Sequence, residues 1–505
     1  MSMILLTGRD LTPENVGRIA RGELKVEIAQ SALRRMEESH ALVREIQESG
    51  KPTYGISTGF GELSRISITG DMNRELQQNL IRSHASGVGK SLDKAAVRAL
   101  MVLRLNALCV GFSGVNPEVT KLLQEFINQG ITPVIPEQGS LGASGDLANL
   151  AHMSLVLIGE GEAEVDGQVL PGEEALKRKD LKPVTLAGKD GLALINGTAF
   201  MLGVGTLTLL EAERCFQAAN AAAALSFEAL RGFRGAYDPR IHELRRQEGQ
   251  MEVAKTLLKL LEGSEYADTR EEDVQDAYAL RCVPQVHGAS KDALDYVRSV
   301  LSREINAVTD NPLVFPETGE VISGGNFHGQ PLALALDFLA IATAELASIS
   351  ERRTERMVNP QLSDGLPAFL CQKSGVQSGF MIPQYVAAAL VSENKVLSHP
   401  ASVDSIPSSA NKEDHVSMGA ISARKARQVV ENTRRVIAIE LLCAAQAIDL
   451  LDKRELGQGT RKVYDLVRSQ IQMNEEDRPP SKDIETLAQM IRDGLLDGAL
   501  AGLML

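Results

Sequence analysis

Long stretches with apolar residues at helical spacing dominate the chain and limit what it can fold into. Charged residues such as Arg104, Asp337 and Glu440 interrupt these stretches, and alanine is frequent in them, so that helices can approach closely. The pattern predicts a mainly α fold built as a long-helix bundle. A chain of 505 residues exceeds one ordinary core, which indicates several domains or one large helical assembly. The clearest stretches are "LDKAAVRALMVLRLNALCVG" (92–111), "QPLALALDFLAIATAELASISERR" (330–353) and "ARKARQVVENTRRVIAIELLCAAQAIDLL" (423–451).

Two short segments alternate apolar and polar residues around a tight turn. "EAEVDGQVL" (162–170) turns at Asp166 and Gly167, and "NPLVFPETGEVISGG" (311–325) turns at Thr318 and Gly319. Both predict small β-hairpins attached to the helical body. "NEEDRPPSKD" (474–483) predicts an exposed, charged linker before a last helix.

Charge and cysteine content exclude several classes of function. The formal net charge of −13 disfavours nucleic acid and anionic membranes as partners. The five cysteines are an odd number without paired spacing, which fits free thiols in a reducing cytoplasm. The first ten residues, "MSMILLTGRD", hold too short an apolar run for a signal peptide, and the longer apolar stretches carry charges. We therefore expect a cytoplasmic protein with no membrane segment.

Metal binding is not expected from the histidine pattern. The eight histidines show no HExxH or related spacing. The adjacent Glu413, Asp414 and His415 are poorly placed to converge on one ion. The sequence predicts no metal site.

One glycine-rich segment carries an unusual chemical possibility. In "QGSLGASGDLANLAHM" (138–153), Ser144 stands between Ala143 and Gly145. An unhindered Gly145 nitrogen can attack the Ala143 carbonyl carbon and close a five-membered ring with loss of one water. Loss of a second water from Ser144 then leaves an exposed carbon–carbon double bond, an electrophile made from backbone. The segment by itself also fits a helix entry capped by Ser144 or Asp146.

Five further segments of the chain resemble one enzyme family, and they occur in the order in which that family has them. With the tripeptide segment, they resemble the ammonia-lyases and aminomutases that build 4-methylidene-imidazol-5-one, known as MIO, from Ala-Ser-Gly. The resemblance implies the long-helix fold that these enzymes share with fumarase- and aspartase-like lyases. It also implies an N-terminal domain (1–200) with the MIO tripeptide and a lid loop, a long-helix bundle domain (201–505), and no external cofactor. The segments are "TYGISTGFG" (53–61), "GLALINGTA" (191–199), "QDAYALRCVPQVHG" (275–288), "SGGNFHGQP" (323–331) and "SSANKEDHVSMG" (408–419).

The resemblance also implies roles for individual residues. Tyr54 matches the catalytic base, which needs acidifying neighbours because a free tyrosine has a pKa near 10. Arg281 matches the group that holds the substrate carboxylate, a task suited to the guanidinium fork. Asn196 can hydrogen-bond both the carboxylate and MIO. The other residues implied to contact MIO are Gln275, Tyr278 and Phe327.

Two segments of the chain bear on the choice of substrate. Ser83 and His84 resemble the histidine branch of the family rather than its tyrosine or phenylalanine branches, and Glu413 fits the same branch. His84 and Glu413 would pair with an imidazole ring, whose burial without polar partners is costly. Lys412 departs from the histidine branch, where glutamine is frequent, and "NGTAF" (196–200) is nearer the aromatic branch.

The resemblance therefore implies conversion of L-histidine to trans-urocanate and ammonia by a carbon–nitrogen lyase. The alternatives are a tyrosine or phenylalanine ammonia-lyase, or a 2,3-aminomutase of the same family. A different class, a catalytically inactive helical scaffold, would keep the tripeptide uncyclised. Family membership implies a homotetramer whose active sites are shared between subunits.

Overall fold

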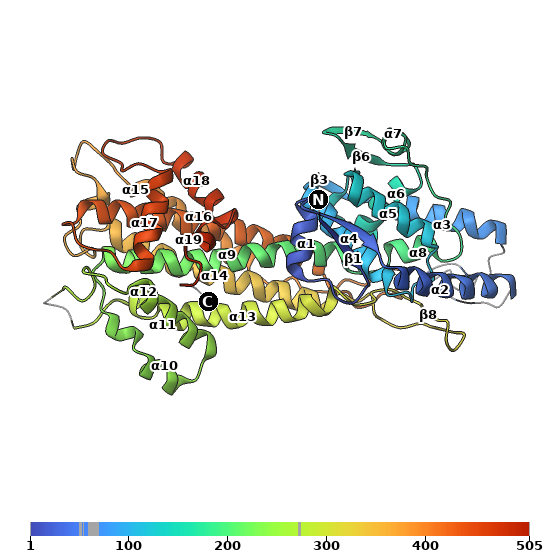
Figure 1. Cartoon of the computed structure of the whole chain (residues 1–505), viewed down its shortest axis with the longest axis horizontal. Coiled ribbons are helices and arrows are strands. Elements are labelled where there is room, and N and C mark those ends of the chain that lie inside the picture. The colour runs from blue at the N-terminus through green and yellow to red at the C-terminus, as the bar shows by residue number, and fades with distance from the viewer. Residues whose placement is uncertain (1, 50–52, 54, 59–69, 271–273, 504–505) are drawn as a thin grey trace. The chain divides into compact units, whose positions relative to one another are not determined.

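Helices dominate the structure, as the periodicity predicts (Figure 1). The computed structural model describes residues 2–49, 53, 55–58, 70–270, 274–503. The three long stretches singled out in the sequence form α4 (Lys94–Cys109), α14 (Gln330–Val358) and α16 (Gly419–Leu450). The prediction of a mainly α, long-helix fold is confirmed.

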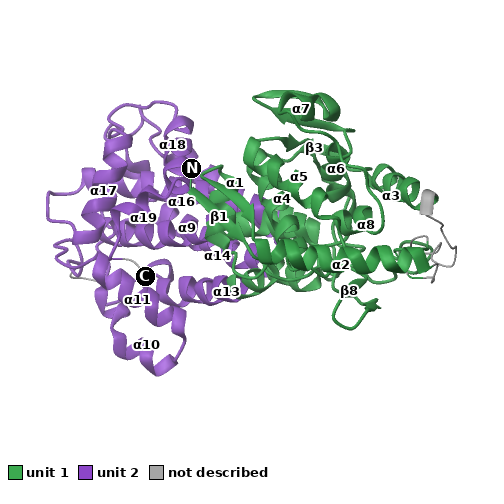
Figure 2. Ribbon diagram, turned by 45° about the vertical axis from the view of Figure 1, so that its right-hand side comes forward, with its two compact units in different colours: residues 1–210, 298–337, 400–424 green, residues 211–297, 338–399, 425–505 purple. Residues whose placement is uncertain are grey.

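The described residues group into two compact units (Figure 2). Unit 1 comprises residues 1–210, 298–337 and 400–424, and unit 2 comprises residues 211–297, 338–399 and 425–505. Both units are assembled from separated segments of the chain, whereas the domains expected from the sequence are continuous. The expected domains, 1–200 and 201–505, stay a prediction.

Unit 1 combines short strands with helices, and both predicted hairpins lie in it. The hairpins are β6 with β7 and β8 with β9, each antiparallel. A parallel pair, β1 with β2, was not predicted from the sequence, and in it Ser2 is opposite Leu24. The elements wholly inside this unit are α1 (Pro13–Ala20), α2 (Gln30–Ser49), α3 (Gly70–His84), α4, α5 (Pro117–Gln129), α6 (Leu147–Leu157), α7 (Gly172–Arg178), α8 (Asp190–Ile195), β1 (Ser2–Leu6), β2 (Leu24–Ile28), β3 (Val88–Ser91), β4 (Thr132–Pro133), β5 (Pro136–Gln138), β6 (Glu162–Val165), β7 (Gln168–Pro171), β8 (Leu313–Phe315) and β9 (Glu320–Ile322).

The centre of unit 1 is α4, which is buried on nearly every side. It lies against α1, α2 and α5. Asp93 caps its N-terminus by accepting a hydrogen bond from the Ala96 nitrogen at 2.9 Å. Arg104 is fully buried in this helix and donates to the carbonyl oxygens of Thr309 and Ala193. A buried guanidinium group in the central helix thus connects α4 to the segments that carry Ala193 and Thr309.

Among the described residues of unit 2, the regular elements are helices, and irregular segments join them. Its own helices are α10 (Pro239–Arg245), α11 (Glu248–Leu260), α12 (Tyr278–Arg281), α15 (Met381–Leu397), α17 (Gln458–Gln470), α18 (Ser481–Arg492) and α19 (Leu495–Ala499), with two short 3-10 turns, Arg234–Tyr237 and Ala368–Leu370. Four longer helices supply residues to both units, namely α9 (Ala199–Ala229), α13 (Val283–Glu304), α14 and α16. Among the described residues, α14 is long and apolar enough to cross a membrane, but 67% of its most apolar window is buried within the structure. Such burial is typical of a core helix.

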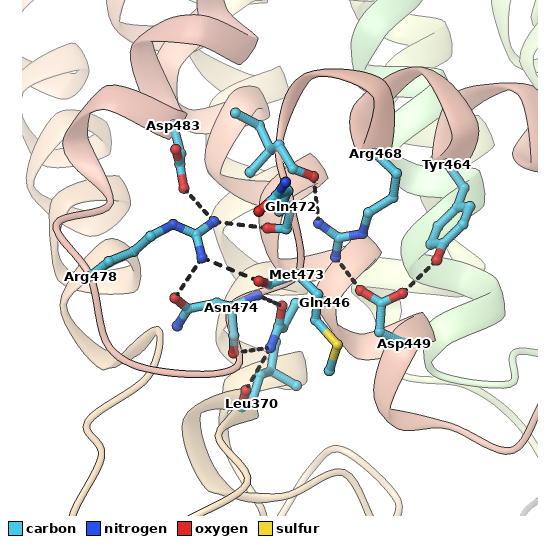
Figure 3. Close-up of polar contacts among 11 residues, drawn as sticks. Leu370, Gln446, Asp449, Tyr464, Arg468, Gln472, Met473, Asn474, Arg478 and Asp483 are labelled. Atoms are coloured by element: carbon cyan, nitrogen blue, oxygen red, sulfur yellow. Dashed lines mark hydrogen bonds and ion pairs between the residues drawn. The ribbon is translucent and has the colours of Figure 1, made fainter.

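Buried polar contacts fix the connection before α18 in unit 2 (Figure 3). The Gln446 side chain of α16 donates to the carbonyl oxygens of Leu370 at 3.3 Å and Asn474 at 3.0 Å, and accepts from the Asn474 nitrogen at 3.0 Å. Arg478 donates to the Asp483 carboxylate at 2.9 Å. The segment predicted as a linker is mostly exposed but held at both ends, and α18 begins within it at Ser481.

We predict that Gln446→Leu strongly destabilises unit 2. The substitution leaves three backbone groups without their partner, and each unmet buried group costs about 1–3 kcal/mol. The free energy of unfolding, from urea titration, should fall by at least about 2 kcal/mol. Gln470→Leu is the matched control, because Gln470 is exposed at the end of α17 and its loss should cost less than about 0.5 kcal/mol. Equal effects would contradict this account.

Candidate active site

The Ala143-Ser144-Gly145 tripeptide forms a tight turn in unit 1, immediately before α6. The Gly145 nitrogen donates to the Gly142 oxygen at 3.3 Å. Ser144 has a φ of 51°, in the left-handed region that disfavours a side chain. The Gly197 nitrogen donates to the Ser144 oxygen at 3.2 Å, so a second segment holds the turn in place.

Glycine is required at two positions of this turn by space as well as by conformation. Gly142 and Gly145 have φ values of 89° and 80°. A Cβ atom on Gly145 would overlap the Gly197 carbonyl, and one on Gly142 would overlap the Ser417 hydroxyl. The unhindered nitrogen that ring closure needs is therefore present in a strained, enclosed turn. The tripeptide fits the MIO group.

Asp146 anchors the turn to the start of α9. Its side chain accepts hydrogen bonds from the Phe200 and Met201 nitrogens, both at 2.9 Å, and thus caps α9 rather than α6, which it precedes. Burial raises the pKa of Asp146 to about 7, against the opposing effect of these two hydrogen bonds. Ser140 donates to the Gly145 oxygen at 3.1 Å and further limits the turn.

A cavity of about 240 Å³ opens beside the turn, and unit 1 lines it entirely. It brings together four of the residues selected from the sequence, namely Ser83, His84, Ala143 and Glu413. The lining residues are Ser83, His84, Ser86, Gly139, Ser140, Leu141, Ala143, Leu147, Ala148, Ser408 and Glu413.

Glu413 reaches the tripeptide directly. The Ser144 hydroxyl donates to Glu413 Oε1 at 3.3 Å, and the Ser408 hydroxyl donates to Oε2 at 3.0 Å. The backbones of Ser408 and Glu413 also pair with each other and close the loop between them. Both carboxylate oxygens are therefore held, and the sequence analysis did not anticipate the role of Ser408.

His84 ends α3 at the rim of the cavity. Its Nδ1 lies 3.0 Å from the Ser83 hydroxyl. Burial lowers the pKa of His84, although the hydrogen bond to the Leu80 backbone and the Glu413 charge act in the other direction. The ring is therefore neutral at neutral pH and can both donate and accept a hydrogen bond.

Asn196 lies one residue before Gly197, at the end of α8. Its Nδ2 donates to Asp310 Oδ1 at 3.1 Å and to the Asn311 carbonyl oxygen at 2.8 Å. Both N–H bonds of the amide are thus in use. Among the described residues, no partner satisfies Asn196 Oδ1, which is buried.

Three of the predicted residues gather in unit 2, around α12. The Arg281 guanidinium hydrogen-bonds the Gln275 side-chain oxygen and lies 4.6 Å from the centre of the Tyr278 ring. Tyr278 is 70% exposed. The structure brings these three together as one exposed cluster, separate in the chain from the tripeptide.

The structure does not test the roles predicted for two further residues. Tyr54 lies outside the described residues. Its neighbour Gly55 has a φ of 71°, and Ile56 is fully buried against Val43 and Val314. Phe327 lies half-buried in a turn between β9 and α14. The roles of Tyr54 and Phe327 stay predictions.

Comparison with known proteins identifies the family. Residues 11–469 match the family described as aromatic amino acid lyase. A histidine ammonia-lyase of Treponema denticola is 58% identical over 488 residues, covering 97% of this chain and 96% of that protein. The crystal structure of histidine ammonia-lyase from Trypanosoma cruzi has a TM-score of 0.93 and 43% identity, covering 100% of this chain and 96% of that one. A tyrosine aminomutase from Streptomyces globisporus has a TM-score of 0.95 and 38% identity, covering 99% of each chain. The chain belongs to the aromatic amino acid lyase family.

We predict that Gly145→Ala disrupts the turn for lack of space rather than for backbone strain. The added methyl group would meet the Gly197 backbone, which cannot move without releasing Ser144 and Asp146. Gly167→Ala is the matched control, since its φ of 83° is similar and nothing lies within 4 Å of an added Cβ. Thermal unfolding should show a loss of about 1 kcal/mol for Gly167→Ala and a clearly larger loss for Gly145→Ala. Similar losses would contradict the steric account.

Proposed function

We propose that the chain is a histidine ammonia-lyase, a carbon–nitrogen lyase that converts L-histidine to trans-urocanate and ammonia. The observation that carries the proposal is the cavity lined by His84 and Glu413, where the Glu413 carboxylate accepts from the Ser144 hydroxyl. A neutral imidazole and a carboxylate are suited to hydrogen-bond an imidazole side chain. Histidine ammonia-lyases that are 58% and 52% identical to this chain support the same substrate.

The prosthetic group proposed here is MIO, made from Ala143, Ser144 and Gly145. When formed, it would supply an electrophilic double bond that promotes loss of the amine. The turn supports this proposal because it leaves the Gly145 nitrogen free of a neighbouring side chain. Ser140, which donates to the Gly145 carbonyl oxygen, would hold that side of the ring. Glu413 accepts from the Ser144 hydroxyl only until that hydroxyl leaves as water, and its carboxylate would then be available to the substrate.

The remaining tasks fall to the chain's own side chains. We assign removal of the β-proton to Tyr54 and capture of the carboxylate to Arg281. The guanidinium of Arg281 is suited to this because its planar fork matches a carboxylate. Gln275 and Tyr278, which already contact Arg281, would orient it, and Phe327 would pack beside the MIO ring.

We also propose a cytoplasmic homotetramer with active sites shared between subunits. Apolar side chains in unit 2 remain exposed and favour association with other copies. Tyr296 and Phe338, for example, are 47% and 49% exposed and pack edge to face. On α15 the exposed apolar residues are Ile382, Tyr385, Val386 and Val396. All five cysteines are free thiols, as expected in a reducing compartment.

The first experiment supplies L-histidine, L-tyrosine and L-phenylalanine separately and follows the ultraviolet absorbance of the conjugated acids. We expect rapid urocanate formation from histidine, together with an intact mass lower by two waters. Ser144→Ala should abolish both, because it has no hydroxyl to lose. A β-amino acid product would instead indicate an aminomutase, and an unchanged mass would favour an inactive scaffold. Reaction with tyrosine or phenylalanine alone would contradict the proposed substrate.

We predict that Glu413→Gln weakens the binding of histidine. The amide retains the size of the side chain and can still accept from Ser408, but it loses the charge that would strengthen a hydrogen bond to the ring. Steady-state kinetics should show KM raised about tenfold. Glu317→Gln, an exposed change of the same type, should leave KM unaltered. An unchanged KM in Glu413→Gln would remove this residue from the specificity site.

A further inference from the structure

A buried ion pair, Lys189 with Asp310, contacts the side chain of Asn196. Lys189 Nζ is 2.6 Å from Asp310 Oδ2, and the two side chains are 0% and 1% exposed. Isolated charges are costly to bury, so each of these two requires the other. Neither residue lines the cavity, and the proposed function gives the pair no task.

The Asp310 carboxylate connects this pair to the site. Its Oδ2 accepts from Lys189, while its Oδ1 accepts from Asn196 Nδ2 at 3.1 Å and from the Asn311 nitrogen at 2.7 Å. A carboxylate engaged by an ammonium group and a backbone N–H presents only acceptors to the amide. The amide nitrogen of Asn196 must therefore face Asp310, which fixes the amide against a flip.

Asn196 is in turn joined to the tripeptide. Its neighbour Gly197 donates to the Ser144 oxygen and accepts from the Asp146 nitrogen at 2.8 Å. A shift or rotation of Asn196 would therefore move Gly197, which contacts the turn. The only polar atom of its side chain left for a ligand is Oδ1, which has no partner among the described residues.

We propose that Lys189 and Asp310 form a positioning pair that acts on the reaction through Asn196. Asp310 holds the amide in one orientation, and Lys189 holds Asp310 in place. This inference rests on the proposed function, because it assumes that Asn196 contacts the substrate or the MIO group. Neither Lys189 nor Asp310 touches the reacting atoms.

A simple stabilising role for the pair would leave a different signature. If the pair acts through Asn196, its removal should have little further effect once Asn196 itself is replaced. If it only supports the fold, the two changes should lower activity independently and their factors should multiply. A double-mutant cycle distinguishes the two.

The pair is removed by combining Lys189→Met with Asp310→Leu, which takes away one positive and one negative charge together. Paired replacement of this kind is often tolerated by a folded protein. We expect kcat/KM to fall about ten- to a hundredfold in the otherwise unchanged full-length protein. On an Asn196→Leu background the same change should lower kcat/KM by less than about threefold. Intact mass reports how much of each variant has lost two waters, and activity is expressed per cyclised chain.

Gln446→Leu is the matched control. Gln446 is also buried, but its side chain bonds to the backbones of Leu370 and Asn474. Its effect should be the same factor in both backgrounds. If the pair variant does not fold, Asp310→Asn is measured in the same cycle, where a smaller effect with the same dependence on Asn196 is expected.

Two results would overturn the proposal, namely an unchanged kcat/KM in the pair variant, or equal factors in both backgrounds. Failure of the proposed function is seen separately, in the unchanged protein. If that protein turns over tyrosine or phenylalanine instead of histidine, the cycle is run with that amino acid and still decides the role of the pair. If it turns over none of the three, the cycle is run on their calorimetric affinities.

Discussion

The backbone contact between the tripeptide turn and Gly197 is the interaction on which the site depends. Gly197 donates to Ser144 and accepts from Asp146, so it holds both sides of Gly145. The contact is so close that a Cβ atom on Gly145 would overlap the Gly197 carbonyl, and Gly197 is itself enclosed by the Thr309 carbonyl on another side. Because the constraint is backbone against backbone, side-chain rearrangement cannot relieve it. The strained turn persists because its surroundings leave no alternative.

Buried polar and charged side chains hold the segments on either side of this contact in place. Asp146 ties the turn to the N-terminus of α9, and the Lys189–Asp310 pair holds Asn196, the residue before Gly197. Arg104 adds hydrogen bonds to the carbonyl oxygens of Thr309 and Ala193. These groups stand on separate segments that meet around α4 and α8. Their hydrogen bonds have defined directions, so they specify the geometry of the turn more closely than apolar packing alone would.

The sequence predicted the features that depend on local pattern. The helices α4, α14 and α16 follow from apolar spacing, and the hairpin at Asp166 and Gly167 follows from turn chemistry. The parallel pairing of β1 with β2 was missed, because it joins two short strands with a helix between them and has no local turn signal.

In the candidate site, too, the features that depend on local sequence were predicted and the long-range contacts were not. The tripeptide was found from its motif, and Glu413 was selected because it fits the histidine branch of the family. The contact between Glu413 and Ser144 spans 269 positions of the chain, and the Lys189–Asp310 contact spans 121. No periodicity links residues so far apart. Long-range partners of buried polar groups therefore require the folded structure.

The loop that carries Glu413 shows how strain and function are combined. Ser409, Ala410 and Asn411 have φ values of 49°, 52° and 65°, three successive residues other than glycine in the left-handed region. Each costs roughly 1–2 kcal/mol relative to an ordinary conformation. The two backbone hydrogen bonds between Ser408 and Glu413 close this loop, and the Ser408 hydroxyl holds the carboxylate as well. A relaxed loop would give Glu413 more freedom, so the strain is the cost of keeping its carboxylate beside Ser144.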